Sequence, residues 1–228
     1  MKKIDWNQIA QIIDSHSLLK HPFYQAWQKG ELTIGDLKIY AKEYYHLESA
    51  FPRFISRVHS ATENPMARRE LLKNLVSEEI EGKSHRELWL DFAGALGVSK
   101  EEMSAHAPSA STRAVVDKFF ELSSASTAEG AAALYAYESQ QPGVAKTKRE
   151  GLVKFYGMKD DSAGVEFFKV HEKADEWHSQ AEKEIIESTG EGERAVPAVA
   201  SAAKALYQFL DGVSEQIRLR DRFVCSLN

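Results

Sequence analysis

The apolar residues of this 228-residue chain recur with the 3.6-residue period of an amphipathic helix, and this pattern constrains the fold more than any other feature. Sustained apolar–polar alternation, the signal of a half-buried strand, is nearly absent, and no turn dipeptide joins two such segments as in a β-hairpin. No internal repeat or long linker divides the chain. We therefore predict one all-α domain over residues 1–228, a bundle of about seven main helices.

Capping residues and prolines predict where the helices begin and end. Thr33 and Asp36 resemble a capping box, and Asn64 is an N-cap followed directly by a proline. Pro142 should break or bend the helix before it. The expected helical segments are 5–15, a short one from 22, 33–59, 64–94, a short one from 99, 108–123, 127 to the break at 142, 144–156, 162–188 and 196–222.

Composition narrows the class of protein. The chain is 43% hydrophobic and 28% charged with a net charge of −5, values that fit an ordinary soluble domain and do not favour nucleic-acid binding. The single cysteine, Cys225, excludes a disulfide scaffold. No apolar run reaches the ~18 residues of a membrane span, and the N-terminus lacks an apolar signal segment. We expect a cytoplasmic protein that binds neither nucleic acid nor membrane.

The expected helix 162–188 carries three metal-ligand side chains on one face. His171, Asp175 and His178 are spaced i, i+4 and i+7, so at ~100° per residue they project within a ~60° arc. Two imidazoles and a carboxylate suit iron, manganese or zinc. A solvated polar face is the competing interpretation, but this stripe overlaps the margin of the apolar side rather than lying opposite it.

A second set of ligand types lies in the expected helix 64–94. Glu78 and His85 are about two turns apart and share a face, and Glu81 lies somewhat to one side as an i, i+4 partner of His85. We prefer Glu78 as the ligand, although spacing alone allows either glutamate. The competing interpretation is an ordinary charged helix exterior.

A third carboxylate, Glu138, stands in an otherwise apolar, small-residue helix, where it is costly unless it is paired or bound to metal. The alternative is that it faces water near a helix end. Three clustered carboxylates repel one another without a cation, whereas two divalent ions would leave the cluster with a charge of about +1. The sequence thus predicts a dinuclear, O2-activating centre, without excluding zinc or manganese. Its ligands would be Glu78, His85, Glu138, His171, Asp175 and His178.

The segments 74–89, 137–140 and 171–178 together resemble the haem-oxygenase-like di-iron oxidases, and most of all the Chlamydia protein associating with death domains and its bacterial relatives. The resemblance spans about residues 5–220. It implies a seven-helix fold, which is shared with the oxidase that synthesises pyrroloquinoline quinone and with thiaminase-II-like proteins. It also implies an Fe/Fe or Mn/Fe pair on those six ligands, with O2 and an external reductant, and related folds suggest a homodimer.

The resemblance further implies formation of para-aminobenzoate for folate synthesis, from one of the protein's own tyrosines and with a lysine as amino donor. Tyr24 matches that tyrosine and Lys148 matches the lysine, with Lys146 as the alternative two residues away. Tyr40 and Tyr137 are further redox-capable candidates near the same site. From the residues alone, a core tyrosine and a solvated lysine would be the simpler interpretations.

Other functions stay open at this point. The first is a di-iron oxidase that acts on a free small molecule such as an amino acid or a fatty acid. A thiaminase-II-like hydrolase is disfavoured, because its cysteine nucleophile would have to be Cys225 near the C-terminus. A cofactorless quinone-synthesis oxidase would not need three carboxylates beside three histidines. The non-enzyme alternative is a helical module that binds death domains.

Overall fold

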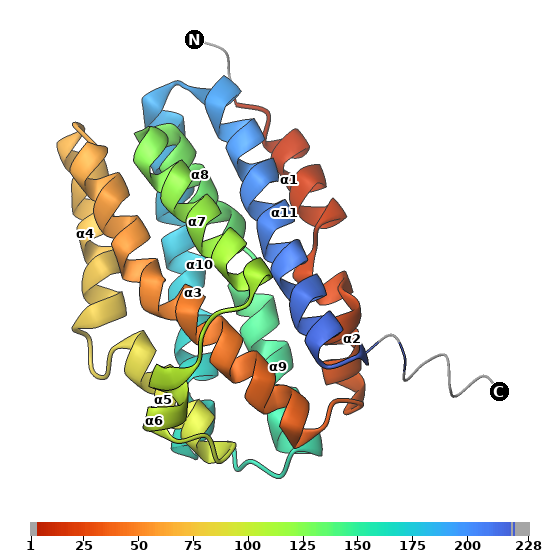
Figure 1. Cartoon of the computed structure of the whole chain (residues 1–228). Helices are drawn as coiled ribbons and strands as arrows, with labels where there is room; N and C mark the ends of the chain where they lie inside the picture. The colour runs from red at the N-terminus through yellow and green to blue at the C-terminus, as the bar shows by residue number, and fades with distance from the viewer. Residues whose placement is uncertain (1–3, 220, 222–228) are drawn as a thin grey trace.

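In the computed structural model, residues 4–219 and 221 are described, and they form helices joined by short turns with no strand among them (Figure 1). This confirms the all-α fold class, although turns divide the chain into more segments than the seven helices expected. The elements are α1 (Trp6–Ser15), η1 (Leu18–Lys20), α2 (Pro22–Lys29), α3 (Ile34–Ala61), α4 (Pro65–Glu79), α5 (His85–Ala95), α6 (Lys100–Ala105), α7 (Ala110–Ala125), α8 (Thr127–Glu138), α9 (Gln141–Phe155), α10 (Ala163–Thr189) and α11 (Gly192–Gln216).

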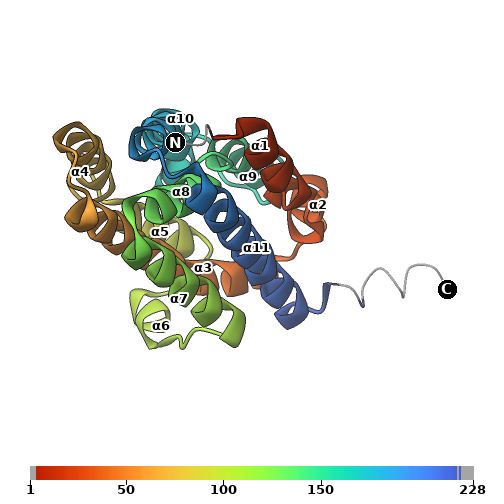
Figure 2. The same ribbon diagram turned by 90° about the horizontal axis from the view of Figure 1, so that it is seen from above.

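Helix α8 is the centre of the bundle because its side chains are small. It packs against α7, α10 and α11, and the view from above shows it among them (Figure 2). Its alanines at 131–133 and 136 are fully or almost fully buried, so neighbouring backbones approach it from several sides. A Cβ at Gly130 would lie 2.4 Å from Val58 Cγ2, which shows how closely α3 crosses α8. The last residues of α8, at its carboxyl end, therefore lie buried in the core.

The expected helix 64–94 is wrong: it is two helices, α4 and α5, separated at residues 80–84. Gly82 has a left-handed φ of +73°. Ser84 then caps α5 through a capping box with Glu87, whose side chain accepts a hydrogen bond from the Ser84 N–H at 3.0 Å. These local signals outweighed the helical period across 78–85. Glu78 and His85 consequently lie on different helices and do not share one helix face.

The other boundaries differ by only a few residues. Helix α3 contains Pro52 and continues as one helix to Ala61. Pro142 lies in the first turn of α9, two residues after the break that ends α8 at Glu138. The long helix expected at 162–188 is α10. The last helix begins earlier than expected and ends at Gln216, and Arg222 lies outside the described residues.

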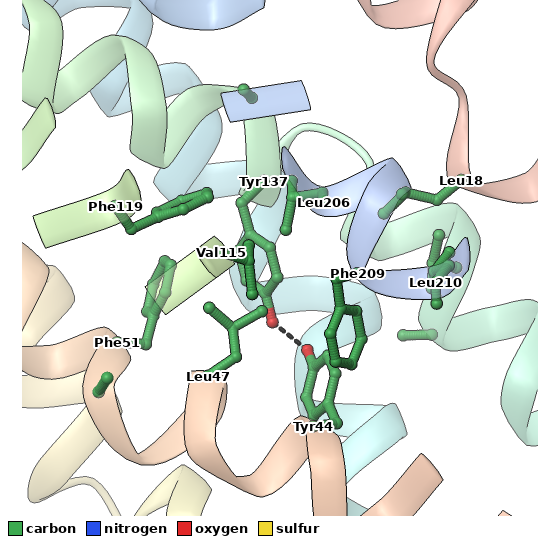
Figure 3. Close-up of a cluster of buried hydrophobic side chains, with 14 of the residues drawn as sticks. Leu18, Tyr44, Leu47, Phe51, Val115, Phe119, Tyr137, Leu206, Phe209 and Leu210 are labelled. Carbon is green, nitrogen blue, oxygen red and sulfur yellow. Dashed lines mark hydrogen bonds between the residues drawn. The ribbon is translucent and has the colours of Figure 1, made fainter. Parts of the chain in front are cut away.

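An aromatic core joins α3, α7, α8 and α11 (Figure 3). Tyr44 of α3 and Tyr137 of α8 face each other there, and their hydroxyls are hydrogen-bonded. Phe51 packs against Tyr137 in a tilted arrangement with ring centroids 4.7 Å apart, and Phe209 lies beside Tyr44. Each such side chain contributes about 1.5–3 kcal/mol by burial, which fixes the helices that carry the site. No helix among the described residues is long and apolar enough to cross a bilayer.

Candidate metal centre and the tyrosine–lysine cluster

The structure brings the six predicted ligands together in the interior. They come from the last turn of α4, the first residue of α5, the end of α8 and the middle of α10. Each is at most 3% exposed, whereas Glu81 in the α4–α5 turn is exposed. The six residues are Glu78, His85, Glu138, His171, Asp175 and His178.

Ligand atoms of these residues lie in direct contact with one another. His85 Nδ1 is 2.8 Å from Glu78 Oε1, and His178 Nδ1 is 3.3 Å from Glu138 Oε1 and 3.4 Å from Asp175 Oδ1. Two atoms that each lie about 2.1 Å from one octahedral ion are about 3 Å apart, and the contacts of His178 with Glu138 and Asp175 are close to this separation. The residues therefore fit a metal site.

Hydrogen bonding supports the same interpretation. Second oxygens of Glu78 and Asp175, and Nε2 of His178, have no hydrogen-bond partner although they are buried. Unpartnered buried polar atoms are rare in proteins and point to a missing partner. Two of the ligands are held by other groups: Asn74 Nδ2 donates to Glu138 Oε1 at 3.1 Å, and His171 Nδ1 donates to the Phe167 carbonyl at 2.7 Å. The His171 bond leaves Nε2 free to bind a metal.

The potential ligands form two groups, each with its ligand atoms within 4.8 Å of one another. One consists of Glu78, Glu138 and His178, and the other of Glu48, His85 and His171. Asp175, the remaining predicted ligand, is in neither group but contacts His178. Glu48 of α3 was not among the residues selected from the sequence, although it carries the signal used for Glu138, a carboxylate on an apolar helix face. Glu182, one turn after His178, is also buried and contacts Glu138. It too was missed.

The protein alone cannot keep all of these carboxylates ionised. Burial, together with the charge of Glu78, raises the pKa of Glu48 to about 8. Burial also raises the pKa of Asp175 to about 7, against the effect of its hydrogen bond with His178. Cations bound among the carboxylates would remove this penalty, so the electrostatics of the cluster favour a metal pair.

Lys148 and four tyrosines form a second buried cluster beside the first. Lys148 Nζ lies 4.8 Å from the centre of the Tyr44 ring and 5.2 Å from the centres of the Tyr24 and Tyr40 rings. The hydroxyls of Tyr24 and Tyr40 are 2.9 Å apart, and Tyr137 completes the cluster through Tyr44. Lys148 is 1% exposed. Lys146, the alternative amine, is exposed.

Burial sets the protonation of this cluster. It lowers the pKa of Lys148 to about 7, although the charges of Glu48 and Asp175 oppose that shift. A large fraction of the amine is therefore neutral and nucleophilic near neutral pH. Burial also raises the pKa of Tyr24 and Tyr40, so both stay neutral phenols.

Close packing of α9 on α2 places Lys148 in this cluster. The Trp27 indole Nε1–H donates to the Lys148 carbonyl at 3.1 Å. A Cβ on Gly151 would lie 2.6 Å from Trp27 Cδ1, so only glycine permits this approach. The sequence showed the glycine but not the contact that requires it.

Comparison with known proteins identifies the family. Residues 38–211 match the iron-containing redox enzymes. The chain belongs to this family. It is 41% identical over 221 residues to a 4-aminobenzoate synthase of Chlamydia muridarum, covering 94% of this chain and 93% of the relative. It is 42% identical to a 4-aminobenzoate synthase of Nitrosomonas europaea, covering 91% and 90%.

The fold is also that of a solved TenA homologue from Pseudomonas syringae, with a TM-score of 0.81, 19% identity and 93% of each chain covered. The comparisons confirm the resemblance predicted from the sequence, and with it a redox enzyme with a metal cofactor. Cys225, on which a thiaminase-II-like mechanism would depend, lies outside the described residues.

Proposed function

We propose that this protein is an O2-dependent iron enzyme that forms 4-aminobenzoate from its own Tyr24, with Lys148 as amino donor. The observation that carries this proposal is the buried contact between the Lys148 amine and the Tyr24 ring, 5.2 Å from Nζ to the ring centre. Ring and nitrogen source are thus already adjacent, beside the candidate metal centre. Relatives at about 40% identity named 4-aminobenzoate synthases support the same product.

The metal pair in this proposal is Fe/Fe or Mn/Fe. When bound, it supplies O2 activation with electrons from an external reductant. Asn74 orients the Glu138 carboxylate and the Phe167 carbonyl orients the His171 ring, so the chain holds these donors in place. We infer that the ligands are Glu78, His85, Glu138, His171, Asp175 and His178.

The chain's other residues prepare the tyrosine and the lysine. Tyr40 holds the Tyr24 phenol by their hydroxyl contact, and burial keeps the Lys148 amine partly neutral. The aromatic wall around Lys148 includes Trp89 and Phe168, with ring centres 5.8 and 5.7 Å from Nζ. This wall excludes water from the two reacting groups.

The test is to grow the protein with ring-labelled tyrosine and amine-labelled lysine, purify it, and supply iron, O2 and a reductant in the presence of unlabelled free amino acids. We expect labelled 4-aminobenzoate by mass spectrometry, in at most one equivalent per chain if Tyr24 is consumed. Tyr24→Phe should abolish the product, at least a hundredfold loss. Tyr207→Phe is the control and should retain the product, because this half-buried tyrosine instead packs edge-to-face against His21.

Product that forms in Tyr24→Phe, or that carries no label, would instead favour the second candidate, an oxidase that acts on a free small molecule. Growth of a strain that lacks its own aminobenzoate genes gives an independent readout. The wild-type gene should restore that growth, and Tyr24→Phe should not.

We also infer a cytoplasmic homodimer, from composition and from related folds. Light scattering should then give about twice the 25.6 kDa mass of one chain. A mass equal to that of one chain would contradict the dimer and leave the chemistry unaffected.

A further inference from the structure

Glu48 is the one member of the two ligand groups that the predicted ligand set does not contain. It lies on α3, is 2% exposed, and has a carboxylate oxygen within 4.8 Å of ligand nitrogens of both His85 and His171. The two histidine rings themselves converge there, with centroids 4.3 Å apart. Without Glu48, the only charged ligands in the centre would come from α4, α8 and α10.

We propose that Glu48 is a seventh ligand of the dinuclear centre and holds one ion together with His85 and His171. Glu78, Glu138 and His178 would hold the other, with Asp175 beside His178. This inference rests on the proposed function, because it requires that two ions bind. It makes the two positions chemically different, because one has two imidazoles and a single carboxylate, whereas the other has one imidazole and the remaining carboxylates.

Charge balance favours this assignment. Three carboxylates around two divalent ions leave about one net positive charge in a buried site, and the Lys148 amine lies close by. Counting the ligands alone, a fourth carboxylate from Glu48 brings the sum of charges to zero. Uncompensated charge is costly in a protein interior, so the neutral centre is the more stable arrangement.

The competing role for Glu48 is that of a counter-ion to Lys148 alone. The two roles differ in what they predict for metal binding, since a counter-ion would leave the occupancy of the ions unchanged. As a ligand, Glu48 would also connect the metal pair to the helix that carries Tyr40 and Tyr44. Metal loading would then act directly on the position of the tyrosine cluster.

The test compares Glu48→Gln with Glu43→Gln. Glu43 is a matched control, because it is a buried carboxylate on the same helix that instead hydrogen-bonds Thr112 and the Ser109 N–H. Metal-free protein is loaded with Fe²⁺ under anaerobic conditions, and bound iron is measured by elemental analysis and titration calorimetry. We expect about two ions per chain in wild type and in Glu43→Gln, and about one in Glu48→Gln or a tenfold weaker second step.

Two ions bound equally well by Glu48→Gln would overturn the proposal, whereas no iron in wild type would instead refute the proposed function. If Glu48→Gln does not fold, a crystal structure of the iron-loaded wild type decides. A Glu48 oxygen at about 2.0–2.2 Å from an ion is expected. A Glu48 carboxylate directed only at Lys148, with both ions bound elsewhere, would refute it.

Discussion

At the scale of single residues, burial is what distinguishes Lys148 from the chain's many surface lysines. Neighbouring positions 146, 149 and 154 are also basic, so the sequence alone favours a solvated face there. What it cannot show is that α9 turns the side chain at 148 into an aromatic pocket, since that depends on packing against α2. The resemblance selected the residue, and the structure shows that burial lowers the pKa of its amine to about 7.

The pKa of Lys148 makes a stability prediction. The pKa of the amine is lowered to about 7 in the folded protein from its ordinary value of 10.5. Between these two pH values the unfolded chain therefore binds more protons than the folded protein. The free energy of unfolding contributed by this residue therefore rises as pH increases from 7 to 10. Lys148→Met, measured by urea denaturation of metal-free protein, should raise stability at pH 7 by about 1–3 kcal/mol and remove that rise. An unchanged pH slope would show that the amine is not buried.

At the scale of helices, periodicity and capping residues predict most of the helices, but they do not predict the break between α4 and α5 that positions Glu78 and His85. Segment 162–188 was placed within one residue, because a long uninterrupted apolar period has few alternatives. The turn at 80–84 was not predicted, because the helical period of apolar residues continues through it, although Ser84 and Glu87 form a capping box there. Glu78 and His85 nevertheless lie in contact, because the turn brings them together. Glu48 shows the same signal as Glu138, a carboxylate on an apolar helix face, but only tertiary contacts show which groups Glu48 and Glu182 face.

The contact between α9 and α2 gives a prediction at this scale. In Gly151→Ala, the new Cβ would lie 2.6 Å from Trp27 Cδ1, so α9 must move and carry Lys148 with it. We expect a loss of about 1–3 kcal/mol in stability and at least a tenfold loss of product, with iron content unchanged. Gly94→Ala is the control, because an added Cβ there meets nothing within 4 Å and the change favours helix by about 1 kcal/mol. Equal behaviour of the two variants would exclude a positioning role for Gly151.

At the scale of the whole molecule, the candidate centre joins α4, α5, α8 and α10, so metal binding and folding are linked. Without ions, the raised pKa of about 8 for Glu48 and about 7 for Asp175 means that the fold binds more protons than the unfolded chain. The contribution of these two carboxylates to the stability of metal-free protein therefore falls as pH rises from about 5 to 8. Bound cations remove this penalty, and their advantage grows with pH because they compete with protons for the same carboxylates.

This linkage predicts the response to metal removal. At an iron concentration one hundred times the dissociation constant, binding should add about 2.7 kcal/mol to stability, which is a rise of about 5–10 °C in Tm for a chain of this length. The rise should be larger at pH 8 than at pH 6, and Glu138→Ala should reduce it at both. Differential scanning calorimetry of chelator-treated and reloaded protein under anaerobic conditions measures these values. A melting temperature that responds equally at both pH values would mean that the ions bind away from the buried carboxylates, and the six converging side chains would then need another explanation.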